Sequence, residues 1–296
     1  MNTSASAKLL LNVRLEVACA TSDIGTGTYT ILTQIAAETL GLHMEDVTVR
    51  LGDSDLPKAP VEGGSWMAAS AGIAVQMACV KVREASFKRA RLLPNPPLAN
   101  ADLDHAWFAG GRVALRQDPT RFVTVADAMA GAKPIEAEET ASTTQPSKLR
   151  RIGYTHSAVF VEVRVDEDLG SVRVTRLVDA VAAGKTLNPQ TARSQVIGGV
   201  VFGIGMALEE ESMADHGPGR FMNHSLAEYH IPVNADVPQI EVIFVGEHDK
   251  VVSPIGVKGL GEIGIVGTAA AIANAIHHAT GNRMRRLPIT VDKLLD

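Results

Sequence analysis

The chain has 296 residues, which is enough for one large domain or two ordinary domains with a substantial buried core. Hydrophobic residues make up 46% and charged residues 21%, a composition that excludes a disordered or fibrous protein. The formal net charge is −5, and the aromatic residues are only 7 Phe, 2 Trp and 3 Tyr. Neither charge nor stacking residues favour nucleic-acid binding, so we expect a folded protein with a different ligand.

The cysteines and histidines argue against a metal held by protein side chains. Cys19 and Cys79 are isolated and form no CxxC motif, and no HExxH motif occurs. We expect both cysteines to be core thiols and expect no zinc site, iron–sulfur cluster or disulfide framework within this chain. The sequence predicts no membrane span and no signal peptide of its own, which leaves the compartment undetermined.

The first third of the chain predicts a strand, a loop, a helix, a strand, a loop and a helix, in that order. A strand-like stretch ends near Ala20 and is followed by a Gly-containing loop at 23–28. Apolar spacing predicts a helix from 28 that Gly41 ends, and a strand begins at Val47. A second loop at 62–65 precedes a long helix that Pro94 stops.

The middle of the chain is weakly patterned until a hairpin begins. Residues 136–148 contain no large apolar side chain and predict a surface connection. Alternating valines at 159–165, a turn at 167–170 and matching alternation at 171–178 predict two antiparallel strands. This hairpin argues against a purely parallel, doubly wound sheet.

The last third repeats the order of the first. A loop at 182–195 leads into a Gly-rich helix at 196–211, a strand follows at 240–247, and a loop at 256–264 leads into a helix at 265–281. We therefore predict an α+β fold with mixed or antiparallel strands, buried Gly-rich helices and two loop-helix-strand-loop-helix units. The predicted divisions are a first ligand-binding subdomain at 1–93, a connecting region at 94–150 and a second ligand-binding subdomain at 151–296, because loops before helix N-termini in both can meet an anionic ligand.

Glycines are placed in two different ways. Gly198, Gly199, Gly203 and Gly205 lie in one predicted helix and would cost it about 4 kcal/mol relative to alanine, so we expect close packing against another backbone. Other glycines stand just before helix starts, where free N–H groups can meet an anionic ligand. These are Gly25, Gly27, Gly259, Gly261 and Gly264.

The string from Gly259 to Gly264 matches GxGxxG, the dinucleotide-binding pattern. Pro254 and Gly256 interrupt the strand that should run into it, and no acidic residue follows at the required distance. An NAD-dependent dehydrogenase therefore remains a remote alternative.

Glu262 lies inside this last Gly-rich loop and has two interpretations. It could cap the following helix through backbone N–H groups, or it could act as a general base. Lys258 could pair with Glu262 or with a ligand phosphate.

Five segments together resemble a known family. Residues 23–42, 63–72, 180–211, 226–242 and 256–281 are similar, in this order, to the C-terminal part of the molybdenum-binding subunit of xanthine dehydrogenase and aldehyde oxidase type enzymes. The likeness is especially close to bacterial three-subunit periplasmic aldehyde oxidoreductases. It implies the molybdopterin-binding fold of the xanthine oxidase type, present here only in part.

The resemblance also implies the cofactor and its site. The cofactor would be a molybdenum ion held by molybdopterin cytosine dinucleotide, and the catalytic glutamate would be Glu262. The implied cofactor-binding residues are Gly25, Thr26, Gly27, Ala68, Ala69, Ser70, Lys185, Thr186, Leu187, Asn188, Pro189, Gln190, Thr191, Gln195, Lys258, Gly259, Leu260 and Gly261.

The implied reaction is oxidation of an aldehyde, or hydroxylation of a purine-type heterocycle, with water as the oxygen source. Glu262 would be the general base, and the electrons would pass to [2Fe–2S] and FAD centres in partner subunits. Family members have a longer molybdenum subunit, so we expect a further chain to supply its N-terminal half and expect no activity without that half. The alternative is a non-catalytic remnant or interaction fragment.

Overall fold

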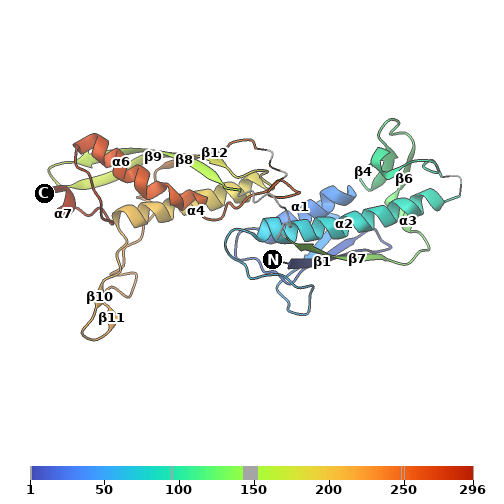
Figure 1. Ribbon diagram of the computed structural model, residues 1–296, viewed down its shortest axis with the longest axis horizontal. Coiled ribbons are helices and arrows are strands. Elements are labelled where there is room, and N and C mark those ends of the chain that lie inside the picture. The colour runs from blue at the N-terminus through green and yellow to red at the C-terminus, as the bar shows by residue number, and fades with distance from the viewer. Residues whose placement is uncertain (1, 95, 143–152, 248, 250, 296) are drawn as a thin grey trace. The chain divides into compact units, whose positions relative to one another are not determined.

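The computed structural model describes residues 2–94, 96–142, 153–247, 249 and 251–295 (Figure 1). It divides into two compact units. The first contains Met1–Ile152 and Lys250–Val257, and the second contains Gly153–Asp249 and Lys258–Asp296. Each unit has a small mixed sheet with helices packed against it, which confirms the predicted α+β fold.

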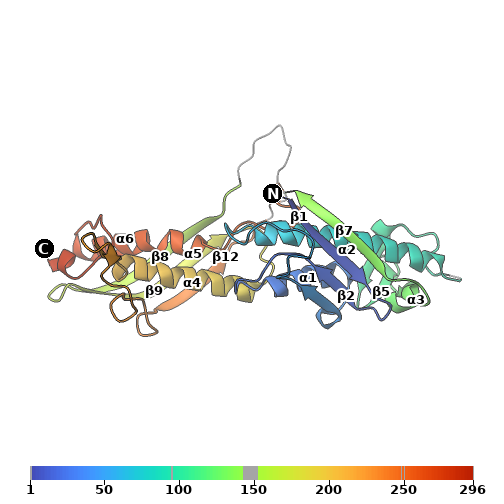
Figure 2. The ribbon, with the colours of Figure 1, turned by 90° about the horizontal axis from the view of Figure 1, so that it is seen from below.

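The first unit is built on a four-stranded sheet with the order β3-β2-β1-β7. Its strands are β1 (Asn2–Leu9), β2 (Leu15–Ala18), β3 (Val47–Arg50) and β7 (Ile135–Ser142). Strand β1 is antiparallel to both β2 and β7, whereas β3 runs parallel to β2. Helix α2 (Met67–Leu92) packs against β1, β7 and α1 (Thr28–Leu40) (Figure 2). Gly41 ends α1 with a left-handed φ of 64°, as predicted.

Strand β7 corrects the surface connection predicted at 136–148. Residues 136–142 belong to a strand that pairs with β1 along its whole length, and 143–148 lie outside the described residues. Ile135 and Ala141 are buried, while Glu136 and Glu138 are exposed. The prediction failed because the inward positions after Ile135 are Ala137, Glu139 and Ala141, which give little hydrophobic contrast with the polar outward residues of this edge strand.

In the sequence, several smaller elements of the first unit come between α2 and β7. A second sheet has the order β4-β5-β6, and the short helix α3 follows its last strand. The Thr124 side chain caps α3 by accepting a hydrogen bond from Asp127 N. The bounds are β4 (Ala106–Ala109), β5 (Arg112–Leu115), β6 (Phe122–Thr124) and α3 (Val125–Met129), with 3₁₀ turns at Met44–Asp46 and Leu103–His105.

The second unit is built on a three-stranded sheet with the order β12-β9-β8. Strands β8 (His156–Asp166) and β9 (Ser171–Ala182) are antiparallel, which confirms the predicted hairpin, and β12 (Gln239–Phe244) runs parallel to β9. The helices are α4 (Pro189–Leu208), α5 (Ile263–Val266), α6 (Thr268–Thr280) and α7 (Asp292–Leu295). A short hairpin of β10 (Ala214–Asp215) and β11 (Arg220–Phe221) projects from the rest of this unit (Figure 1).

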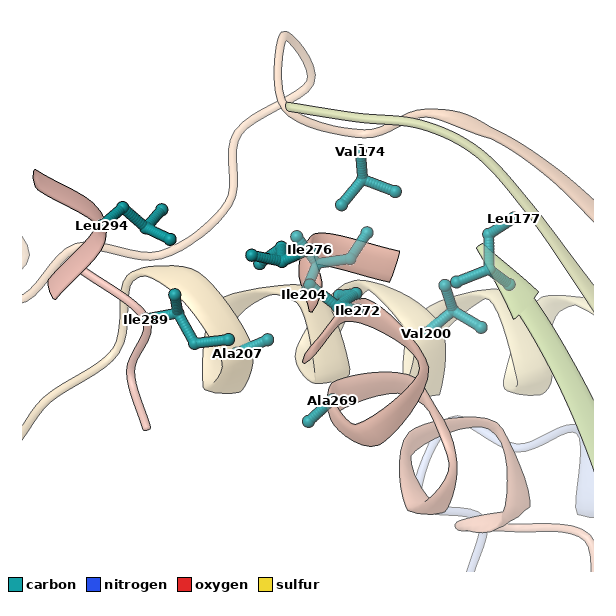
Figure 3. Packing of buried hydrophobic residues seen from close by; sticks show 10 residues of the cluster. All are labelled: Val174, Leu177, Val200, Ile204, Ala207, Ala269, Ile272, Ile276, Ile289 and Leu294. Atoms are coloured by element: carbon teal, nitrogen blue, oxygen red, sulfur yellow. The ribbon is translucent and has the colours of Figure 1, made fainter. Parts of the chain in front are cut away.

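One hydrophobic cluster joins β9 to the helices of the second unit (Figure 3). Its fully buried Leu177, Ile204, Ile272 and Ile276 come from β9, α4 and α6. Burying a side chain of this size contributes roughly 1.5–3 kcal/mol. The whole cluster comprises Val174, Leu177, Val200, Ile204, Ala207, Ala269, Ile272, Ile276, Ile289 and Leu294.

The two units share one strand topology, which confirms the predicted repeat. In the first, the hairpin β1-β2 is followed by α1, the strand β3 parallel to β2, and α2. In the second, the hairpin β8-β9 is followed by α4, the strand β12 parallel to β9, and α5 with α6. In both cases the second hairpin strand is the middle one of the three.

Helix α4 differs from its prediction in two respects. It begins at Pro189 rather than near Val196, because Asn188 caps it and proline suits the first helical turn. Only Gly199 makes the expected close approach to another backbone, at Gly264–Ile265. A Cβ at Gly203 would meet the side chain of Thr268, one at Gly205 would meet the side chains of Glu210 and Pro232, and one at Gly198 would have nothing within 4 Å. Among the described residues, α4 is the one helix long and apolar enough to cross a membrane, a property that core helices share.

Candidate functional site

The loop Lys258–Glu262 is fixed by side chains from other elements of the second unit. The hydroxyl of Thr155 donates to the carbonyl of Gly259 at 2.6 Å. The amide Nε2 of Gln195, on α4, donates to the carbonyl of Gly261 at 2.7 Å. Two carbonyls of the loop are therefore held in place, and the loop's conformation depends on residues about 66 and 104 positions away in the chain.

Lys258 is buried at the base of this loop, with a side chain only 6% exposed. Its ammonium donates to Glu247 at 2.5 Å, to Asp249 at 3.1 Å and to the carbonyl of Tyr154 at 3.2 Å. The hydrogen bond with Glu247 raises the pKa of Lys258 despite burial. The pairing with Glu262 that the sequence left open is therefore wrong, because two nearer carboxylates bind the ammonium.

Glu247 connects this loop to the loop that precedes α4. One carboxylate oxygen accepts from Lys258, and the other accepts from the backbone N–H of Gly184 at 3.1 Å. The bond from Lys258 holds the pKa of Glu247 below its usual value. The backbone N–H of Lys258 also donates to the carbonyl of Ala183 at 3.1 Å. The bases of the two predicted cofactor loops of this unit therefore lie side by side.

Glu262 is exposed and its carboxylate has no hydrogen-bond or ion-pair partner among the described residues. It occupies the residue position before α5, but its side chain makes no capping bond, so the capping interpretation is wrong. Leu260 and Ile263 pack against the cluster around Val196, which anchors the chain on both sides of Glu262. A free carboxylate thus stands on a rigid backbone.

The same loop also presents unused backbone donors. Among the residues that the structure describes, none accepts a hydrogen bond from the backbone N–H of Gly259, Gly261 or Glu262. Unpaired N–H groups and a carboxylate within four residues can bind the acceptor oxygens of a ligand and accept a proton beside it.

The loop Lys185–Thr191 is shorter than predicted. Pro189, Gln190 and Thr191 form the first turn of α4 rather than a loop. The side-chain oxygen of Asn188 accepts from the backbone N–H of Gln190 and of Thr191, each at 3.0 Å. Lys185 is exposed, whereas Thr186 and Leu187 are half-buried.

The first unit holds the loop Gly25–Gly27, and its amides do not match the prediction. The carboxylate of Asp23 accepts from Gly25 N at 2.9 Å, Gly27 N at 3.2 Å and Tyr29 N at 3.2 Å. The N–H groups expected to be free at Gly25 and Gly27 are therefore paired. Both glycines have positive φ, 96° and 86°, which lets the loop curl around this carboxylate.

The stretch Ala68–Ser70 lies in the first turn of α2. Ser70 is buried, and its hydroxyl donates to a carbonyl one turn earlier at 3.0 Å. Glu62 accepts from the backbone N–H of Ser22 at 2.5 Å, and its pKa is lowered chiefly by backbone hydrogen bonds. Glu62, in the loop before α2, therefore ties that loop to the loop before α1.

Sequence reasoning missed the residues that support the site. Thr155, Glu247 and Asp249 had no local pattern, because each acts on a distant segment of the chain. For Asp179 a local pattern did exist, since alternation along β9 places this residue on the inward face with Leu177. It is fully buried, neither carboxylate oxygen has a hydrogen-bond partner within the part of the chain that the structure describes, and burial raises its pKa to about 6.

The dinucleotide alternative is not supported by the fold around Gly259. Strand β12 ends at Phe244, well before Gly259, and the helix that opens after the motif, α5, has only four residues. The strand-turn-helix unit that presents a pyrophosphate to a long helix is therefore missing from the described residues.

Comparison with known proteins identifies the family. Residues 1–238 match the family model of the molybdopterin cofactor-binding domain. The chain belongs to this family. Its ligand class is thus the molybdopterin cofactor, in agreement with the resemblance given by the sequence.

Two relatives of this chain are named as molybdenum-binding subunits. It is 45% identical over 278 residues to PaoC, the molybdenum-binding subunit of an Escherichia coli aldehyde oxidoreductase, covering 93% of this chain and 36% of PaoC. It is 30% identical over 304 residues to a putative xanthine dehydrogenase molybdenum-binding subunit of E. coli, covering 99% of this chain and 39% of the relative. The chain thus spans little more than a third of these relatives.

Solved structures agree on the fold. Quinoline 2-oxidoreductase from Pseudomonas putida 86 superposes with a TM-score of 0.86 at 24% identity, covering 99% of this chain and 38% of that one. Carbon monoxide dehydrogenase from Oligotropha carboxidovorans gives a TM-score of 0.84 at 21% identity, covering 99% and 36%.

Proposed function

We propose that this chain supplies the general base of a molybdenum hydroxylase that oxidises aldehydes. The observation that carries the proposal is the carboxylate of Glu262, which has no partner among the described residues and stands on a loop fixed by Gln195 and Thr155. The 45% identity to an aldehyde oxidoreductase subunit favours aldehydes over purine-type heterocycles.

The residues of the second unit fit the cofactor. Backbone N–H groups at Gly259, Gly261 and Glu262 without described acceptors are suited to the oxygens of a molybdopterin dinucleotide, which we propose to be the cytosine form. Lys258 is bound to Glu247 and Asp249, so its role is to fix the loop rather than to bind a phosphate. When bound, the cofactor supplies the two-electron redox chemistry.

Glu262 would move one proton in this reaction. Its carboxylate accepts a proton from the oxygen atom, ultimately derived from water, that forms the new bond to the aldehyde carbon. The balance is aldehyde plus water giving carboxylic acid, two protons and two electrons. Because this chain has only two cysteines, both buried and unpaired with each other, we propose that the electrons pass to [2Fe–2S] and FAD centres in partner subunits.

The test is reconstitution of this chain with the portion of PaoC that it does not match and with the partner subunits of that enzyme. We expect molybdenum incorporation and oxidation of an aldehyde such as benzaldehyde. Glu262→Gln should lower kcat by 10²–10⁴-fold with molybdenum content unchanged. The matched control is Glu167→Gln, in the exposed β8-β9 turn, which should have wild-type activity.

Retention of full activity by Glu262→Gln would refute the assignment of the base. A reconstituted complex that takes up no molybdenum would instead identify the chain as a non-catalytic interaction fragment. Hydroxylation of hypoxanthine without oxidation of aldehydes would move the substrate class to heterocycles.

A further inference from the structure

Asp179 on β9 is a buried acid that takes no part in the proposed proton transfer. Its side chain is fully buried, and neither carboxylate oxygen has a hydrogen-bond partner among the residues that the structure describes. Most buried polar side chains in folded proteins have a partner, because an unpaired carboxylate loses its hydration without compensation. An aliphatic residue would fill this position of the strand without that cost, so the presence of an acid needs an explanation.

Asp179 lies where the two hydrophobic clusters of the second unit meet. Two residues before it on β9, Leu177 belongs to the cluster of Figure 3, and two residues after it the strand joins the cluster around Val196. Leu260 and Ile263, one on each side of the candidate base, pack against this second cluster. The carboxylate therefore borders the packing that holds the loop of the candidate base on the sheet.

The short helix α5 is held by packing on both sides of Asp179. The register partners of Asp179 are Val242 on β12 and Val159 on β8. Val242 belongs to the cluster around Val196, against which the first residue of α5 packs. At the other end of α5, a Cβ added to Gly267 would lie 2.8 Å from Cγ2 of Val159. A change at Asp179 is therefore positioned to affect both ends of α5.

Among the described residues, no charged side chain faces Asp179. The residues beside it on β8 and β12 are valines, and the charged residues of these strands alternate onto the outer face of the sheet. Burial by itself raises the pKa of Asp179 to about 6. The titratable residues of the surrounding elements are His156, Glu162, Arg164, Asp166, Arg173, Arg176 and Glu241 on the outer face of the sheet, Arg193 on the exposed side of α4, the exposed Glu262 before α5, and His277 and His278 in the last turn of α6.

We propose that Asp179 is a positioning residue for the loop of Glu262 and makes the packing of that loop depend on pH. This rests on the proposed function, because it assigns a control to the same site. While Asp179 is neutral, α5 and the loop before it stay packed on the sheet. When Asp179 is ionised, states in which they move away become more populated, because water solvates the charge and the apolar core does not. Asp179 itself exchanges no proton with the substrate.

The direction and size of the effect follow from the pKa of Asp179 in the two states. In the packed state the pKa is about 6, and in an opened, hydrated state it returns toward the ordinary value of 3.8. The packed state therefore binds more protons, so opening is rare at low pH and becomes more populated as pH rises through 6. Between pH 5 and pH 8 the ratio of opened to packed molecules should increase about tenfold.

Hydrogen exchange of single amides measures this opening in the full chain. The amides of Lys258, Ile263 and Ile265 donate to backbone carbonyls of the second unit, so their exchange reports on opening of the loop and of α5. After correction for the intrinsic exchange rate at each pH, we expect their protection factors to fall about tenfold from pH 5 to pH 8. In Asp179→Asn, whose side chain has the same shape and cannot ionise, protection should be equal at the two pH values.

Two further variants complete the experiment. Asp166→Asn is the matched control, because Asp166 lies at the exposed end of β8, and this variant should keep the wild-type pH dependence. Asp179→Ala also cannot ionise and leaves no polar group to bury, so it replaces Asp179→Asn if that variant does not fold.

Three results would overturn the proposal. The first is equal protection of the wild-type amides at pH 5 and pH 8. The second is a tenfold fall that persists in the variants of Asp179. The third is a fall of the same size at the amides of α1 in the first unit, because pH would then destabilise the whole chain rather than loosen this loop.

The positioning role and the proposed function can fail separately, because hydrogen exchange requires no catalysis. Glu262→Gln should keep the wild-type pH dependence of protection, since it leaves Asp179 unchanged. If protection depends on pH as expected but the reconstituted Glu262→Gln complex stays fully active, the proposed function alone is refuted. If Glu262→Gln abolishes aldehyde oxidation but protection does not depend on pH, the positioning role alone is refuted.

Discussion

The two units follow the same strand topology and use the same device between their loops. In each, a glutamate from the connection after the third strand accepts a backbone N–H from the loop after the second. Glu62 accepts from Ser22 N at 2.5 Å in the first unit, and Glu247 accepts from Gly184 N at 3.1 Å in the second. The shared topology brings the equivalent loops together in both units.

The units differ in the hydrogen bonding of a second carboxylate. In the first unit, the Asp23 carboxylate accepts hydrogen bonds from three backbone N–H groups of its own loop, and the connection between β3 and α2 ends at Trp66. In the second, the connection ends at Glu262, whose carboxylate has no partner among the described residues. Topology positions a loop, but the hydrogen bonds available to a carboxylate decide whether it can take part in chemistry.

After the loss of activity in Glu262→Gln, the largest expected difference between the units is in how the free energy of unfolding depends on pH. Burial raises the folded-state pKa of Asp179 to about 6, so between about pH 4 and pH 6 the folded state binds more protons than the unfolded state. Stability from this group is complete below pH 4 and falls as pH rises through 6, by about 3 kcal/mol at most.

Asp179→Asn should therefore remove that fall, which urea unfolding at pH 4 and pH 8 would measure. Glu62 has a lowered pKa and contributes stability that is lost on acidification, so Glu62→Gln should remove a dependence of the opposite sign. If the stability of Asp179→Asn depends on pH as that of the wild type does, the predicted role of Asp179 is wrong.

A glycine in each unit's central helix should respond differently to alanine. At Gly203 in α4 the new Cβ would lie 2.5 Å from Cβ of Thr268, so we expect Gly203→Ala to destabilise by about 2 kcal/mol. At Gly72 in α2 the nearest atoms are the terminal carbons of Ile35 and Ile255, at 3.0 and 3.1 Å.

Since those side-chain ends can move, Gly72→Ala should change the unfolding free energy by less than about 1 kcal/mol. Urea unfolding followed by circular dichroism compares the two variants. Equal losses at Gly72 and Gly203 would show that close packing is a common property of both helices rather than of α4.

Replacing a paired lysine in each unit should change the free energy of unfolding by unequal but smaller amounts. Lys258 is buried, and Lys258→Met leaves Glu247 and Asp249 facing each other, which we expect to cost about 1–2 kcal/mol because both carboxylates are partly hydrated. Lys8 pairs with Glu136 at 3.3 Å on the exposed side of the first sheet, so Lys8→Met should cost less than about 0.5 kcal/mol.

Added salt sharpens the comparison of these lysines. The contribution of the exposed Lys8 pair should vanish at 1 M NaCl, whereas most of the Lys258 effect should remain, because buried charges are screened less. Thermal unfolding of the two variants at low and high salt would measure this. A loss in Lys258→Met that vanishes with salt would contradict the burial argument.

Much of the fold was predictable because it depends on local pattern. The alternation from Val159 to Val165 predicted the β8-β9 hairpin, and Gly41 predicted the end of α1. Strand β7 was missed, since its inward face carries two alanines and a glutamate beside one isoleucine and gives little hydrophobic contrast. The start of α4 was placed too late, because Asn188 and Pro189 form a capping arrangement that outweighs the polar composition of the first turn.

The candidate site divides in the same way. Glu262 and the loop around it could be found from the sequence, because a single acid among glycines before an apolar helix is unusual. The partners of Lys258 could not be found from the sequence. Glu247 and Asp249 precede it by 11 and 9 residues, and no helical or strand spacing relates them to it.

The sequence by itself therefore determined the loop-helix-strand-loop-helix order in both units, the family and the residue expected to act as base. The tertiary structure decided which polar groups remain free. Asp23 and Glu262 are both acids in Gly-rich loops before helices, yet one is surrounded by backbone donors and the other meets none among the described residues. That difference depends on distances between atoms, which folding sets and residue order alone does not reveal.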